Sequence, residues 1–292
     1  MTTYDQLLDA GVHFGHLKRK WNPRMAPYIF MEKSGIHIID LHKTQVKMEE
    51  AAHALKQIAK SGKKVLYVST KKQVKDIVAN EAKRVNMPYI TERWPGGMLT
   101  NFATIRKSVK KMTSLDKMLT DGTAENISKR ERLFISRQKA KLEKLLGSIT
   151  DLGRQPAALL IVDIVKEHIA VKEAQKLNIP TFAIVDTNAD PTQIDFPIPG
   201  NDDATKSVAL IMGVLTNAIE EGLAERRTEK EAEKDTVPAA EREEQEARAA
   251  AGIFEPSDED DAAVVAGVVK TTKASGKALR PRKPGAPKLK KD

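Results

Sequence analysis

The sequence contains no cysteine, no long apolar run and no phosphate-binding glycine motif. The absence of cysteine excludes disulfides and thiolate-bound metal sites across all 292 residues. No apolar run approaches the ~18–20 residues of a membrane span. The N-terminal residues lack the basic and apolar regions of a secretory signal. We therefore expect neither a membrane partner nor export.

The missing glycine motifs argue against a nucleotide-binding enzyme. Neither G-x-G-x-x-G nor G-x-x-x-x-G-K-[ST] occurs, and Gly96-Gly97 follow Trp94-Pro95 instead of joining a strand tightly to a helix. Asp163 and Asp186 nevertheless follow predicted strands, at the sheet edge where ligands of open α/β folds bind. An enzyme with a nucleotide or phosphorylated ligand in the Asp163/Asp186 crevice is the alternative hypothesis. The main hypothesis has no catalytic residue, no cofactor and no small-molecule substrate.

Two weak metal patterns do not lead to a metal site. His13 and His16 are spaced i, i+3 and can present two imidazoles, but the sequence shows no complete ligand set around them. Residues 186–190 begin like a calcium loop, yet its sixth position is Pro191 and its twelfth is Pro197, where glycine and glutamate are required. We expect no bound metal.

The hydrophobic pattern predicts an α/β fold with parallel strands. The unbroken apolar run at 157–162 and the segments at 65–68 and 181–185 are typical of strands buried on both faces. Amphipathic segments indicate helices between and around them, and a short strand is expected at 89–90. The other predicted elements are helices at 43–60, 71–85, 166–177 and 202–227, an irregular or extended segment at 12–34, and a polar loop at 186–201.

A helical pair interrupts the α/β pattern. Residues 102–119 place apolar side chains along one side, and a second helix after the polar segment 120–128 does the same up to Ile149. Two such helices joined by a short link favour an antiparallel coiled-coil hairpin, spanning 102–150, that projects from the sheet domain. Its outer faces carry mostly Lys and Arg.

The charge is unevenly distributed along the chain. The net charge is +9 overall, while residues 229–261 contain 4 Lys and Arg against 13 Asp and Glu, and residues 270–292 contain 9 against 1; residues 1–228 therefore carry +10. We divide the chain into a basic α/β domain, 1–228, and a charged tail, 229–292, whose composition is typical of disorder.

Such a positive surplus favours a polyanionic partner, most often nucleic acid. It recurs at 18–24, at 71–75 with 83–84, and along the helical hairpin, with aromatic residues within or beside two of these places. This pattern predicts contacts to phosphates and not base-specific recognition. The candidate RNA-contacting residues are Lys18, Arg19, Lys20, Trp21, Arg24, Arg93, Trp94, Arg106, Lys107, Lys110, Lys111 and Arg137. A helical adaptor that works without RNA is a third hypothesis.

Four sequence blocks resemble the family of bacterial small-subunit ribosomal protein S-two. They are L-L-D-A-G-V-H-F-G-H at 7–16 with W-N-P at 21–23, S-T-K-K-Q at 69–73, R-W-P-G-G-M-L-T-N at 93–101, and D-T-N at 186–188 with P-G-N-D-D-A at 199–204. The similarity extends from about Tyr4 to Glu221. Pro95 and Ile164-Val165 depart from the usual pattern, and the tail exceeds the common family length.

The resemblance implies a flavodoxin-like, three-layer α/β/α domain that carries the coiled-coil hairpin. It also implies a structural, non-catalytic protein of the cytoplasmic small ribosomal subunit, near the head–body junction. The expected partners are small-subunit rRNA, neighbouring ribosomal proteins and the large mRNA-binding protein S-one, which the family helps to hold near the mRNA exit.

Overall fold

The computed structural model describes residues 3–120 and 128–236. The chain divides into two compact units, residues 1–231 and 232–292, and the architecture below is that of the first unit. The predicted link between the hairpin helices and most of the predicted disordered tail lie outside the described residues.

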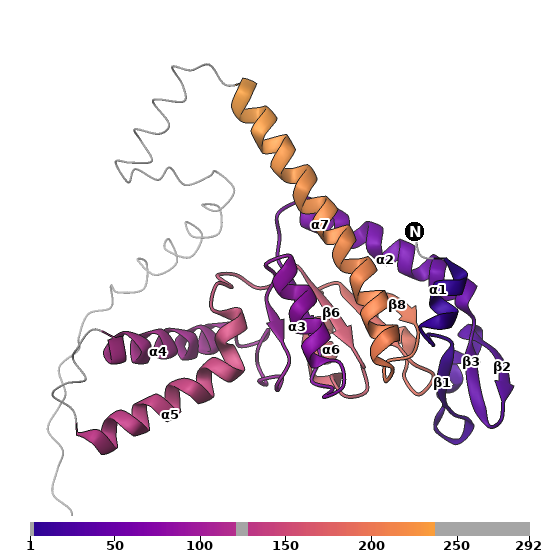
Figure 1. The fold of residues 1–292 in the computed structure, drawn as a ribbon, viewed down its shortest axis with the longest axis horizontal. Helices are drawn as coiled ribbons and strands as arrows, with labels where there is room; N and C mark the ends of the chain where they lie inside the picture. The colour runs from indigo at the N-terminus through magenta and orange to yellow at the C-terminus, as the bar shows by residue number, and fades with distance from the viewer. Residues whose placement is uncertain (1–2, 121–127, 237–292) are drawn as a thin grey trace, which may run out of the picture. The chain divides into compact units, whose positions relative to one another are not determined.

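A five-stranded parallel sheet forms the centre of the first unit (Figure 1). Its strands are β4 (Val65–Val68), β5 (Tyr89–Ile90), β6 (Ala158–Val162), β7 (Thr181–Val185) and β8 (Phe196–Pro199). They lie in the order β5-β4-β6-β7-β8. Numbered along the sheet's own strands, this is the 2-1-3-4-5 order of flavodoxin-like folds. The expected fold class is confirmed.

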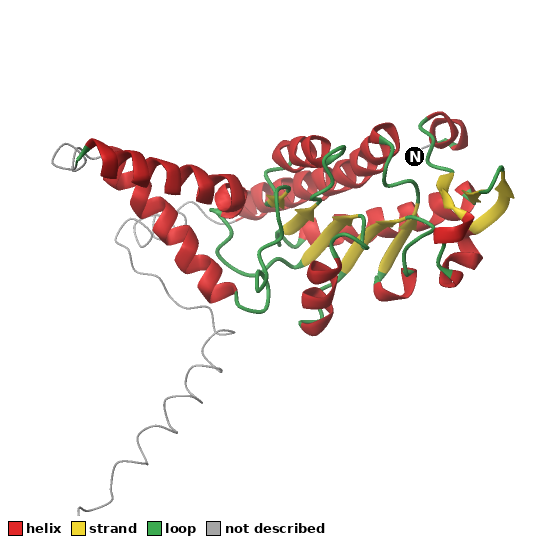
Figure 2. Cartoon of the chain, turned by 90° about the horizontal axis from the view of Figure 1, so that it is seen from below, coloured by secondary structure: helices red, strands yellow, loops and turns green. Residues whose placement is uncertain are grey.

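Helices cover both faces of this sheet (Figure 2). Alternate strand residues point to opposite faces, so that Tyr67 joins one apolar core and Leu66 the other. One core includes α2 (Leu41–Lys60), α3 (Lys75–Arg84) and α7 (Thr205–Thr236). The other includes α6 (His168–Lys176) and the base of the helical pair. These are the three expected layers.

The segment predicted as irregular or extended forms a second, antiparallel sheet in the order β1-β3-β2. It follows the short helix α1 (Tyr4–Asp9) and precedes α2. Its elements are β1 (Phe14–Leu17), η1 (Lys18–Lys20), η2 (Pro23–Tyr28), β2 (Ile29–Lys33) and β3 (Ile36–Ile39). The sequence did not predict this sheet, because its strands are mostly exposed and lack the strong burial signal of the central ones.

The prediction of an uninterrupted polar loop at 186–201 was wrong. Residues 191–193 form the 3-10 turn η5 (Pro191–Gln193), and β8 pairs in parallel with β7, with Ile198 opposite Ile184. Pro197 and Pro199 hid this strand, since proline cannot donate to a ladder and is confined mainly to edge strands. β8 is an edge strand, which reconciles the prolines with the fold.

The helical pair consists of α4 (Phe102–Thr120) and α5 (Lys129–Leu146), followed by η4 (Gly147–Ile149). The two helices contact each other, with Val109, Met112 and Leu115 buried on α4. They form an arm beside the α/β sheet (Figure 1). The insertion is therefore helical; its supercoiling as a coiled coil stays a prediction.

Helix α7 is long and apolar enough to cross a membrane by length and composition alone. Five of its apolar residues, however, are buried against the central sheet and α2. They are Val208, Ile211, Met212, Leu215 and Ile219. We interpret α7 as a core helix of the α/β unit.

Candidate nucleic-acid interface

Lys71 lies where the strand order reverses, just after β4. Its Nζ atom is 2.8 Å from Asp202 Oδ1, 2.7 Å from Asp203 Oδ1 and 3.5 Å from Asp163 Oδ2. In open α/β sheets this is the position that receives phosphates and other ligands. Here a phosphate would meet carboxylates that already pair with the one lysine. The chain's own ion pairs therefore fill the crevice of the alternative, enzymatic hypothesis.

The charges in this cluster respond to their burial. Burial, assisted by the charges of Asp186 and Asp163, raises the pKa of Asp202 to about 7 against the opposing effect of Lys71. Burial by itself would lower the pKa of Lys71, but hydrogen bonds to Asp202 and Asp203 raise it above its ordinary value. Lys71 therefore keeps its charge, and Asp202 and Asp203 both pair with it.

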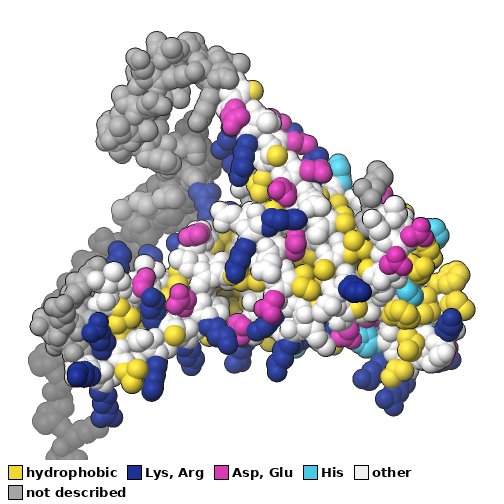
Figure 3. Space-filling view, in the orientation of Figure 1, with side chains coloured by type: hydrophobic (Ala, Val, Ile, Leu, Met, Phe, Trp, Pro, Cys, Tyr) yellow, Lys and Arg dark blue, Asp and Glu magenta, His cyan; other side chains and the backbone are white. Residues whose placement is uncertain are grey.

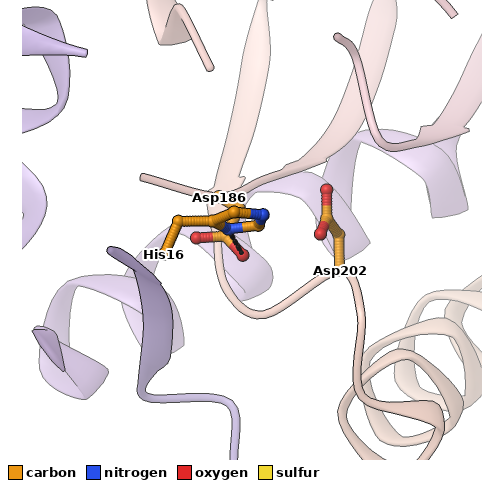
Figure 4. A group of neighbouring side chains, drawn as sticks. All are labelled: His16, Asp186 and Asp202. Carbon is orange, nitrogen blue, oxygen red and sulfur yellow. Dashed lines mark ion pairs between the residues drawn. The ribbon is translucent and has the colours of Figure 1, made fainter. Parts of the chain in front are cut away.

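His16 connects strand β1 to the same cluster (Figure 4). Its Nδ1 atom lies 2.9 Å from Asp186 Oδ2, and its backbone N–H donates to Thr187 Oγ1 at 2.8 Å. A side chain at Gly15 would place a Cβ 2.6 Å from Thr187 and 2.9 Å from the His37 carbonyl oxygen. Glycine is thus required for the close approach of β1. The H-F-G-H block of the sequence has this structural role.

The cluster also brings together groups that could hold a metal ion. His16, Asp186 and Asp202 each offer one ligand atom, and these atoms lie within 4.8 Å of one another. Imidazole and carboxylate ligands suit a divalent transition metal, although Lys71 already supplies a positive charge to Asp202. The sequence could not show this grouping, because its members are far apart along the chain. His13, which the spacing pairs with His16, is not a member of this group, and its ring packs on Phe14 with centroids 4.0 Å apart.

Glu173 organises the loop that leads to the arm. Its side chain is 8% exposed, and its two carboxylate oxygens accept hydrogen bonds from Trp94 Nε1 and from the backbone N–H groups of Gly97, Leu99 and Thr100. Burial alone would raise the pKa of Glu173, but these hydrogen bonds lower it below its ordinary value. The sequence analysis did not identify this residue. The only sequence signal for its role was the position of a glutamate on the apolar side of a predicted helix, which indicates a buried carboxylate.

The predicted RNA-contacting residues at 18–24 lie on the edge of the N-terminal sheet. Arg19, Lys20 and Trp21 are exposed. Lys18 Nζ is 2.7 Å from Glu32 Oε2. The guanidinium of Arg24 pairs with Asp190 and donates to Thr192 Oγ1 at 3.1 Å, which ties this segment to η5. Arg24 therefore has a structural contact in addition to its predicted one.

The predicted residues on the arm separate into two kinds. Lys107, Lys110 and Lys111 on α4 and Arg137 on α5 are exposed. Arg106 is half-buried and donates to the Leu152 carbonyl oxygen at 2.9 Å, so it fastens the arm to the segment after η4. A groove of about 420 Å³ lies along this side of α4. It is lined by Arg106, Val109, Lys110, Thr113, Ser114, Lys117 and Thr150.

The remaining two predicted residues lie in the loop held by Glu173. Arg93 is exposed, whereas Trp94 is 6% exposed and belongs to the apolar core. The ring of Trp94 is not available at the surface, so we leave it out of the interface. In Figure 3, Lys and Arg side chains gather over the arm and again beside the N-terminal sheet.

An exposed apolar surface adjoins the N-terminal sheet and was not predicted. Phe30 is 71% exposed, Phe14 49% and Met31 48%. They line a cavity of about 400 Å³ together with Tyr4 and Leu8 of the α1 segment. Figure 3 shows the apolar side chains at this edge of the molecule. Apolar patches of this kind are typical of protein-binding surfaces.

These features define a class of protein: a flavodoxin-like α/β scaffold with ion pairs of its own at the usual ligand position and with exposed cations along a helical arm. Sequence comparison specifies the class further. Residues 7–222 match the family described as Ribosomal protein S2, and the chain belongs to this family.

The relatives carry a single description, small ribosomal subunit protein uS2. The relative from Phocaeicola vulgatus is 69% identical over 229 residues, which cover 78% of this chain and 82% of the relative. That from Parabacteroides distasonis is 60% identical over 265 residues, covering 91% and 95%. That from Flavobacterium johnsoniae is 65% identical over 239 residues, covering 82% and 94%.

The family membership establishes a ribosomal protein of the small subunit, a component of the ribosome and of translation, and not an enzyme. It confirms the resemblance drawn from the sequence blocks. It also agrees with the ion pairs of Lys71, which lie where the enzymatic alternative would place a ligand.

Proposed function

We propose that the protein binds small-subunit rRNA through phosphate contacts from its arm and its N-terminal segment. The observation that supports this most is the row of exposed cations on α4, Lys107, Lys110 and Lys111, on an arm with few nearby acids. Arg137 lies on the adjoining helix. Cations on a projecting arm can follow a phosphate backbone. Such binding releases counterions from the RNA, and its affinity falls as the salt concentration rises because that release becomes less favourable.

The N-terminal segment supplies a second set of contacts in this proposal. Arg19, Lys20 and Trp21 are exposed side by side, and Arg93 adds a positive charge at the root of the arm. Lys18 and Arg24 have acidic neighbours within the chain, so we expect smaller contributions from them. Two separated basic surfaces on one compact unit would fix the orientation of the protein on folded RNA.

The decisive measurement is the salt dependence of the complex between the full chain and small-subunit rRNA. Six to ten phosphate contacts predict a loss of roughly 10³–10⁵ in affinity between about 50 and 200 mM salt. K107A/K110A/K111A should flatten the salt slope by about one for each contact removed. The control K63A/K172A/K176A removes three exposed lysines elsewhere and should leave the slope unchanged. An affinity that does not vary with salt would contradict the proposal.

Sedimentation of a cell lysate separates this proposal from an adaptor that works without RNA. The protein should sediment with small subunits and leave that fraction after ribonuclease treatment. Calorimetry with nucleotides tests the enzymatic alternative, for which saturable binding is required; we expect none, because Lys71 and its carboxylate partners fill the crevice.

We also propose contacts to neighbouring small-subunit proteins, among them the large mRNA-binding protein S-one, at a place near the head–body junction where mRNA is positioned. The apolar surface around Phe30 and Met31 supports protein contact, because the large apolar side chains of Phe14, Phe30 and Met31 remain exposed there. Subunits reconstituted with F30A/M31A should lose part of their complement of neighbouring proteins, measured by mass spectrometry. V46A, which removes an exposed apolar side chain on α2, is the control.

A further inference from the structure

We propose that Phe134 on α5 stacks against an unpaired base of the rRNA, in addition to the phosphate contacts above; the inference rests on the proposed rRNA binding. Phe134 is 60% exposed, next to Leu133 at 51%. It precedes the half-buried Ile135 on the inner side of the helical pair. A residue one step away in a helix points about 100° around the axis. The phenyl ring therefore stands on the flank of the arm.

Cations surround this ring along the helix. Arg130 lies four residues before Phe134, Arg137 three residues after it and Lys141 seven residues after it, and all three are exposed. Residues three and four apart are neighbours on a helix surface, and seven residues make two turns. The four side chains thus form one stripe in which the aromatic ring lies between positive charges. Glu131, three residues before Phe134, is an exposed acidic neighbour, and it lies on the other side of the ring from Arg130 and Arg137.

This arrangement suits single-stranded RNA. Proteins recognise looped or bulged RNA by stacking unstacked bases on aromatic side chains, while cations hold the phosphates on either side. A lone exposed phenylalanine carries no such meaning. In a phenylalanine flanked by three cations, the ring can stack on a base while the cations contact the phosphates on either side of that base. An apolar surface of a partner protein would fit this stripe less well. It would offer the three cations no acidic groups, and burying them there without such partners would cost free energy.

The test compares variants of the full chain for binding to small-subunit rRNA. Because stacking on one base is worth a measurable part of the affinity, F134A should weaken binding roughly 5- to 140-fold. F134W should keep or improve the affinity, since it retains an aromatic face. L133A is the matched control, an exposed apolar residue on the same turn but a different side of α5, and should change the affinity less than twofold. All variants should keep the wild-type unfolding midpoint.

The salt dependence distinguishes stacking from charge contacts. F134A should keep the wild-type salt slope because it removes no phosphate contact, whereas R130A/R137A/K141A should flatten it. Equal affinities of F134A and L133A would overturn the inference. So would an F134A variant that binds rRNA normally but loses a neighbouring protein from reconstituted subunits, since the ring would then contact protein. A wild-type chain without salt-dependent binding would instead defeat the underlying proposal of rRNA binding.

Discussion

The imidazole of His16 and the carboxylate of Asp186 join the two sheets of this protein. His16 belongs to β1, Asp186 follows β7, and the two groups lie 2.9 Å apart. Through this contact the N-terminal sheet, which is mostly exposed, is attached to a buried group of the α/β domain. The carboxylate is 1% exposed, so its partner is important for satisfying its charge.

The first prediction concerns this contact. H16A should loosen the antiparallel sheet without unfolding the central one, because it removes the histidine's side-chain bond and leaves a buried carboxylate with fewer partners. Hydrogen exchange should become faster in β1 and β3 and stay unchanged in β6 and β7. H53A, which alters an exposed histidine on α2, is the control. Identical exchange in the two variants would contradict the proposed role of His16.

The second prediction concerns Lys71. K71M should lower the free energy of unfolding by about 3–5 kcal/mol, because it leaves buried carboxylates without their cation. The lysine side chain is 12% exposed, so little solvent is present to compensate. K72M, at the exposed neighbouring position, should change stability by no more than about 0.5 kcal/mol. Urea unfolding measures both. Equal stabilities of the two variants would show that the cluster does not depend on Lys71.

The third prediction concerns the pH dependence caused by Glu173. Its pKa in the folded protein lies below its ordinary value of 4.5. The carboxylate therefore contributes stability above the unfolded-state pKa, and this contribution is lost as the pH falls through the lowered folded-state pKa. E173Q should remove that part of the acid dependence and destabilise the protein at neutral pH. Unfolding midpoints between pH 3 and 7 measure the difference.

The control for Glu173 is E143Q, on the exposed face of α5. It should leave the acid limb of the stability curve as it is in the wild type. If E173Q and the wild type lose stability in parallel between pH 5 and 3, the hydrogen bonds to the loop before α4 do not control this titration.

The fourth prediction uses two glycines of the same helix, α7. G222A should destabilise the protein by about 1–3 kcal/mol through overpacking, because its Cβ would lie 2.4 Å from the Lys56 carbonyl oxygen. G213A should instead stabilise it by up to about 1 kcal/mol, since no heavy atom lies within 4 Å of its added Cβ and alanine favours a helix. Thermal unfolding measures both. Changes of the same sign would show that α7 does not pack on α2 as described.

Much of the fold could be predicted from local sequence. The apolar runs of β4, β6 and β7 are long enough to be recognised as buried strands, and the periodicity of α3, α4 and α6 indicates their buried faces. The strand β8 was missed because Pro197 and Pro199 are untypical of a strand. The N-terminal sheet was missed because exposed strands carry a weak pattern.

The candidate site was predictable only in part. Clusters of Lys and Arg are visible in any sequence; these side chains are exposed on α4 and α5, and the interface that they were predicted to form stays a prediction. Burial of Trp94 and the carbonyl contacts of Arg106 were not visible, because each depends on residues distant in the chain. The exposure of the Phe134 ring likewise could not be predicted, because it depends on which side of α5 packs against α4.

The sequence by itself determined the class of fold, the basic character of residues 1–228 and the family, because hydrophobic periodicity, charge and motif spacing are local properties of the chain. Only the tertiary structure decided which charged groups meet. The parallel order of the strands brings Lys71, Asp163, Asp186 and Asp202 to one edge of the sheet, and the close approach at Gly15 adds His16. That convergence depends on the order of the strands in space, which residue spacing does not record.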